Sequence, residues 1–190
     1  MTDAPPPWPL DDLDRWVADA HVDEAVAQRR RTAWLRRQAD EDATLGGVLR
    51  ELGERGRPVV VHAITGRRHR GLLTTVGDDL IVLRTVRGVR VIVMLGAVIS
   101  VRAHAEGTPV TDERTEVAGD VTGGATLTST LVGLAGERTS VVVTAVNGDT
   151  TSGEVIAVGR DMLTLQLEGA GLAYVAFASV AEVVAAPESG

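Results

Sequence analysis

The chain has 190 residues, of which 44% are hydrophobic, 3% are aromatic and none is cysteine. Its core must therefore be aliphatic, and disulfides and thiolate metal sites are excluded. No apolar run approaches the roughly 20 residues that a membrane span needs, and the N-terminus lacks the basic and apolar regions of a signal peptide. We therefore expect a cytoplasmic protein with no membrane partner.

The net charge of −7 argues against coating of nucleic acid by the whole chain, but the charge is unevenly distributed. Counting Arg against Asp and Glu gives −4 for residues 1–56, −5 for 105–137 and −4 for 138–190. Residues 57–104 carry +6. One basic segment in an acidic protein indicates a local site for an anionic partner or for an acidic surface.

The first 41 residues divide into a tail and a helical segment. Residues 1–9 are rich in proline and are predicted to be disordered, with a polyproline ligand as the alternative. Residues 10–41 contain no glycine or proline, and an apolar stripe that includes Leu13 and Trp16 predicts a helix. The arginines within 29–37 admit three interpretations: a solvated helix face, a phosphate-contacting arm or a dimerisation helix.

The remainder of the chain contains an internal repeat. A shift of 82 aligns residues 43–101 with 125–183 without a gap and gives 18 identities in 59 positions, where chance would give roughly 5. We therefore predict two units, at residues 43–103 and 125–185. Residues 104–124, rich in Gly, Pro, Thr and acidic residues, are predicted to be the linker.

Each unit is predicted to contain a short helix followed by five short strands. Three leucines at helical spacing predict the first helix: Leu45, Leu49 and Leu52. Alternating apolar residues after Pro58 predict a first strand. Thr65-Gly66, matched by Asn147-Gly148 in the second unit, predicts the hairpin that follows, because Asn and Gly accept positive φ.

Three successive motifs resemble the Sm/Sm-like superfamily of small barrels, which includes the Hfq-type bacterial RNA chaperones. They are Thr44–Leu49, Arg57–Val61 and Gly66–Gly71, in the order helix, first strand and Gly-x4-Gly hairpin. The resemblance implies five-stranded barrels and RNA binding. The chain departs from the family pattern at 77–80, which lacks the Asn that holds a base, and at 94–97, which lacks the basic residue.

Together these patterns predict an α+β, mainly β protein. Its N-terminal helical segment is followed by two tandem Sm/SH3-like five-stranded barrels, each preceded by a short helix. Residues 91–95 are unusually apolar, and an exposed apolar strand edge favours aggregation, so it should be covered. We expect either that the two units pair within one chain or that the chain forms a homodimer.

Six arginines of the first unit align with acidic, polar or apolar residues in the second. They are Arg67, Arg68, Arg70, Arg84, Arg87 and Arg90. The functional interpretation is a regulatory protein whose basic first unit binds RNA or DNA phosphate. The alternative is a protein-interaction or scaffold module, in which these arginines complement the acidic second unit, the linker or another subunit. The first unit has no aromatic residue for base stacking, which argues against sequence-specific binding of single strands.

The sequence offers little for catalysis or cofactor binding. His62 and His69 flank the first hairpin and could approach one another, but no third metal ligand is evident. No Ser/His/Asp arrangement and no phosphate-binding loop stands out. Asp79 and Asp161 recur at a turn, where a carboxylate usually caps backbone amides. We therefore predict no enzyme activity, no metal and no cofactor.

Overall fold

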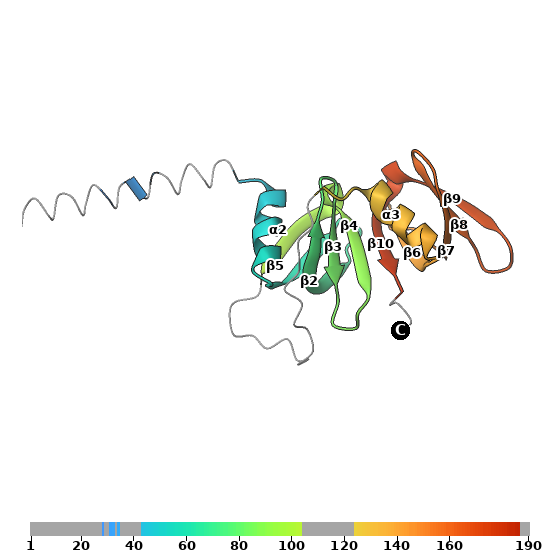
Figure 1. The fold of residues 1–190 in the computed structure, drawn as a ribbon, viewed down its shortest axis with the longest axis horizontal. Helices are drawn as coiled ribbons and strands as arrows, with labels where there is room; N and C mark the ends of the chain where they lie inside the picture. Colours follow the sequence, from blue (N-terminus) through green and yellow to red (C-terminus); the bar gives the residue numbers. More distant parts are fainter. Residues whose placement is uncertain (1–27, 29–30, 33, 35–42, 104–123, 187–190) are drawn as a thin grey trace, which may run out of the picture. The chain divides into compact units, whose positions relative to one another are not determined.

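The computed structural model describes residues 28, 31–32, 34, 43–103 and 124–186 (Figure 1). The chain divides into two compact parts, residues 1–44 and 45–190, and the second part contains both repeats. Within residues 1–44, four exposed residues are helical: Gln28, Arg31, Thr32 and Trp34. The predicted tail, the rest of the predicted segment 10–41 and nearly all of the predicted linker 104–124 lie outside the described residues.

The described part of residues 45–190 contains two α-helices, ten strands and two short 3-10 helices. We call the two repeats the first and second copies. The elements of the first copy are α2 (Leu45–Glu54), β1 (Pro58–Ala63), β2 (Arg68–Val76), β3 (Leu80–Arg84), β4 (Arg90–Met94), η1 (Leu95–Ala97) and β5 (Val98–Ala103). Those of the second copy are α3 (Leu127–Gly136), β6 (Ser140–Ala145), β7 (Thr150–Val158), β8 (Met162–Gln166), β9 (Leu172–Ala176), η2 (Phe177–Ser179) and β10 (Val180–Ala185). No helix among the described residues is long and apolar enough to cross a membrane.

The structure confirms the internal repeat. Every element of the second copy begins 82 residues after its counterpart in the first. The predicted hairpin turns are also present, with Gly66 at φ 81° and Gly148 at φ 90°. Their amide groups donate hydrogen bonds to the carbonyl oxygens of Ala63 and Ala145, at 3.0 and 2.9 Å. We therefore number equivalent positions of the two copies by this offset of 82.

The prediction of two tandem five-stranded barrels is wrong, because all ten strands form one continuous antiparallel sheet. The strand order is β5-β1-β2-β3-β4-β10-β6-β7-β8-β9. The ladder passes from one copy to the other where Val93 of β4 lies opposite Glu182 of β10 and Arg90 lies opposite Ala185. The apolar edge of β4 is thus paired with the last strand of the other copy, and the sheet continues through that point.

The hydrophobic core follows the same continuity. One cluster joins Leu49 of α2 to the buried face of the first copy. The other joins the three buried leucines of α3 to the second copy and to three residues of the first: Leu80, Val82 and Ile92. Strand β3 is therefore buried on both faces, whereas its counterpart β8 exposes Met162. Helix α3 packs mainly against β7 of its own copy, and its Thr130 and Leu134 also lie beside Val82 of β3 and Ile92 of β4.

Candidate functional site

Arginines of the first copy gather on the face of the sheet opposite to the buried Val59 and Val61. In an antiparallel sheet, residues opposite one another point to the same face. Val60 of β1 lies opposite Arg70 of β2 and Arg102 of β5. Its neighbour on that face, His62, lies opposite Arg68. Three strands therefore bring three arginines and a histidine together.

The same face continues across β3 and β4. Leu72, the next residue of β2 on this face, lies opposite Arg84, and Arg84 lies opposite Arg90. Gly71 permits this close approach of β2 and β3, since a Cβ there would lie 2.4 Å from the carbonyl oxygen of Arg84. We refer to Arg68, Arg70, Arg84 and Arg102 as the basic face; all four are exposed.

The remaining predicted arginines occupy other positions. Arg67 precedes β2 and Arg87 lies in the turn between β3 and β4, and both are exposed. Arg90 is partly buried, and its Nη2 lies 3.1 Å from Oε2 of Glu137 at the C-terminus of α3. Arg102 was not among the predicted site residues. Two sequence features could have indicated it: the alternation of residues along the last strand, and the alignment of Arg102 with the apolar Val184 in the second copy.

The electrostatic environment of the basic face is evident at His62. Burial lowers the pKa of this imidazole, and the guanidinium groups of Arg68 and Arg102 lower it further. The protonated form is disfavoured because it would add a positive charge beside two others. The unfolded chain then binds the proton more readily, so His62 reduces stability as the pH falls below about 6.5.

A polyanion bound to the basic face is expected to raise the pKa of His62, because its negative charge offsets Arg68 and Arg102. By linkage, affinity should then increase as the pH falls through the His62 titration. NMR titration of the His62 ring protons, with and without a short oligonucleotide, measures the shift. An unchanged His62 pKa when the oligonucleotide is bound would contradict a ligand on the basic face.

The equivalent face of the second copy has a different character. A groove of about 820 Å³ lies there, and its lining includes two glutamates and no arginine. Ser152, Gln166 and Glu168 of this lining align with Arg70, Arg84 and Val86 of the first copy. Polar and acidic side chains therefore stand where the first copy has arginines, and one of the two glutamates, Glu154, is ion-paired with Arg138.

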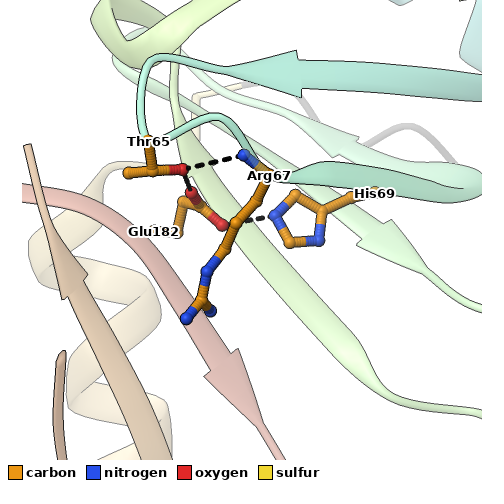
Figure 2. Close-up of polar contacts among 4 residues, drawn as sticks. All are labelled: Thr65, Arg67, His69 and Glu182. Atoms are coloured by element: carbon orange, nitrogen blue, oxygen red, sulfur yellow. Dashed lines mark hydrogen bonds and ion pairs between the residues drawn. The ribbon is translucent and has the colours of Figure 1, made fainter. Parts of the chain in front are cut away.

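A buried carboxylate joins the two copies, and it was not predicted from the sequence (Figure 2). Glu182 of β10 is fully buried. The Thr65 hydroxyl donates a hydrogen bond to its Oε1, and Nε2 of His69 contacts its Oε2. The backbone amide of Arg67 donates to Thr65 Oγ1 at 3.4 Å. These side chains belong to the first hairpin of one copy and the last strand of the other, so they fix the junction between the copies.

The expectation that His62 and His69 could approach one another is wrong. His69 lies opposite Val61, whereas His62 lies one residue further along β1, so the two imidazoles point to opposite faces. Among the described residues, no group of three or more His, Cys, Asp and Glu side chains is arranged to hold a metal ion.

A second polar contact joins the copies at the start of α3. The carboxylate of Asp79 accepts hydrogen bonds from the backbone amide of Leu127, at 3.1 and 3.3 Å. The predicted amide-capping role of this turn residue is thus confirmed, although the amide belongs to the other copy. Thr126 and Ser129 add a capping box to the same helix end. Helix α3 is therefore anchored to the first copy at its N-terminus.

No known family model, curated protein or solved structure is significantly similar to this chain. The resemblance of residues 44–71 to Sm-like proteins stays a prediction from sequence motifs.

Proposed function

We propose that this is a non-enzymatic binding protein whose basic face contacts the phosphate backbone of RNA or DNA. The observation that supports this proposal most directly is the clustering of four exposed arginines on one face of four adjacent strands. Guanidinium groups bind phosphate oxygens through two parallel hydrogen bonds, which suits them to this ligand. The equivalent positions of the second copy carry no arginine, so we expect the ligand on the first.

The chemistry of the basic face favours binding with little sequence selectivity. Residues 43–103 contain no Phe, Tyr or Trp on which bases could stack. Contacts to phosphate position a nucleic acid but carry no sequence information. We therefore expect binding that depends steeply on salt, and a cytoplasmic role as a regulator that recognises charge and spacing.

The variant Arg68→Glu/Arg70→Glu/Arg102→Glu is expected to lower affinity for a 20-nucleotide oligomer by about 100-fold at low salt. The plot of log affinity against log salt concentration should also become less steep, with the magnitude of its slope reduced by about 2 to 3, because three phosphate contacts are lost. Fluorescence anisotropy across a salt series measures both quantities. All three positions are exposed, so the fold should be retained.

The matched control is Arg50→Glu/Arg55→Glu/Arg138→Glu, which changes the net charge equally at exposed arginines outside the basic face. We expect it to alter affinity by only a few-fold. If both triple variants lost affinity equally, the effect would be one of net charge and the basic face would not be the site. Absence of binding by the wild-type chain at low salt would remove the proposal altogether.

A protein-interaction or scaffold module is the alternative, and the Arg90–Glu137 ion pair between the copies favours it. In that case the arginines would stabilise contacts within the chain or with another subunit. The triple variant of the basic face would then lower stability or assembly and leave nucleic-acid binding unchanged. Thermal denaturation of the same variants separates the two functions.

A further inference from the structure

The contact between the two copies, here called the internal junction, has three parts. Strand β4 pairs with β10, helix α3 lies beside β3 and β4, and Asp79 caps the first amide of α3. The repeat supplies a second, incomplete set of the same parts. Strand β9 is equivalent to β4, β5 to β10, α2 to α3, and Asp161 to Asp79. Strands β5 and β9 are the two ends of the sheet.

The two ends of the sheet carry apolar side chains at positions equivalent to those of the internal junction, but these side chains are not covered. Positions buried at the junction have equivalents at the ends that are apolar and exposed. The pairs, with exposed fractions, are Ile92 (2%) and Tyr174 (65%), Ala181 (0%) and Ile99 (67%), and Leu127 (3%) and Leu45 (43%). Large exposed apolar side chains on unpaired strand edges favour association with another chain.

We propose that the protein assembles head to tail with further copies of itself, with β9 of one molecule paired to β5 of the next. The internal junction fixes the expected register, since Val93 lies opposite Glu182 and Arg90 opposite Ala185. The offset of 82 places Val175 opposite Ser100 of the next molecule and Leu172 opposite Ala103. Helix α2 of that molecule then lies beside β8 and β9, as α3 lies beside β3 and β4.

The polar groups of the two ends fit this contact. Asp161 is exposed and stands where Asp79 stands at the internal junction, so it reaches the backbone amide of Leu45 in the next molecule. Glu182, Thr65 and His69 are replaced by Ser100, Asn147 and Thr151. These three side chains are uncharged and can hydrogen-bond to one another, so the contact buries no carboxylate.

The two ends of the sheet differ, so the contact is heterologous and each molecule can bind two others. Assembly then proceeds beyond the dimer until a ring closes or a filament grows. A symmetric dimer would use one end only, which provides a clear experimental distinction.

Two variants that each block one end test the proposal. Tyr174→Lys blocks β9 and Ile99→Lys blocks β5, and both sites are exposed, so the fold should tolerate them. Size-exclusion chromatography with light scattering should give species of three or more chains for the wild type and monomer for each variant. An equimolar mixture of the variants should give a dimer and nothing larger, because one intact end of each remains. Val86→Lys, at an exposed position in the β3–β4 turn, is the matched control and should assemble as the wild type does.

The other outcomes overturn the proposal. A monomeric wild-type chain at 100 μM would show that the ends do not associate. If one variant still dimerised alone, the contact would be symmetric and would use the other end. Circular dichroism spectra and melting curves of both variants establish that loss of assembly is not loss of fold.

Discussion

Replacing His69 with leucine is expected to lower the free energy of unfolding by about 3 kcal/mol, because it removes one partner of a buried carboxylate. Glu182 is fully buried between the two copies and has His69 and Thr65 as its polar contacts. Without the imidazole, one carboxylate oxygen loses its partner in a site that water does not reach. Urea denaturation followed by circular dichroism measures the change.

Two further variants make this prediction specific. His62→Leu alters the same residue type in the same hairpin on the opposite face, and should change the free energy of unfolding by less than about 1 kcal/mol. His69→Leu/Glu182→Leu should recover most of the lost stability, since apolar side chains of similar size can replace a buried pair. If the double variant were less stable than His69→Leu, the carboxylate would not be the source of the cost.

Replacing Gly77 with alanine is expected to lower the free energy of unfolding by about 3 kcal/mol, the upper end for overpacking. A Cβ at this position would lie 2.0 Å from the carbonyl oxygen of Ala125, so one of the two chain segments must move. That carbonyl accepts a hydrogen bond from the Asp78 amide at 3.2 Å, and Asp79 caps α3 next to it. The movement would therefore loosen both contacts that anchor α3. Thermal and urea denaturation measure the loss.

Gly159 provides the control for Gly77, because it occupies the equivalent turn of the second copy. A Cβ there would meet the flexible side chain of Met162 at 3.1 Å, which can move aside. We expect Gly159→Ala to cost less than about 1 kcal/mol when it is measured in the Tyr174→Lys background, where self-association does not contribute. Equal losses for both glycines would show that the turn conformation, and not the contact with Ala125, is responsible.

The repeat and its elements could be predicted because they depend on local chemistry. Leu49 and its neighbours at helical spacing, the alternation after Pro58 and the hairpin at Asn147-Gly148 each specify a short stretch of backbone. The joining of the copies into one sheet could not be predicted, because it depends on which strand pairs with β4. Strand β4 is buried by β10 and α3, and neither partner is close to it in sequence.

The candidate site was predicted only in part, because some of its residues come together through strand pairing. Arg68, Arg70 and Arg84 were found by comparing the copies, and the sheet register then added Arg102. Glu182 was missed because its equivalent, Ser100, lies on an edge strand, so the alignment gives no sign of burial. Its role follows from pairing with the other copy, which only the three-dimensional arrangement defines.

The covalent connection of the two copies has a consequence for stoichiometry. A single-copy protein that assembled through the same contact could surround itself entirely with arginine-bearing neighbours. Here each basic copy is joined through β4 and β10 to one acidic copy of the same molecule. The ratio of basic to acidic copies is therefore fixed at one to one, and a long polyanion would meet the basic face only at every second copy along any such array.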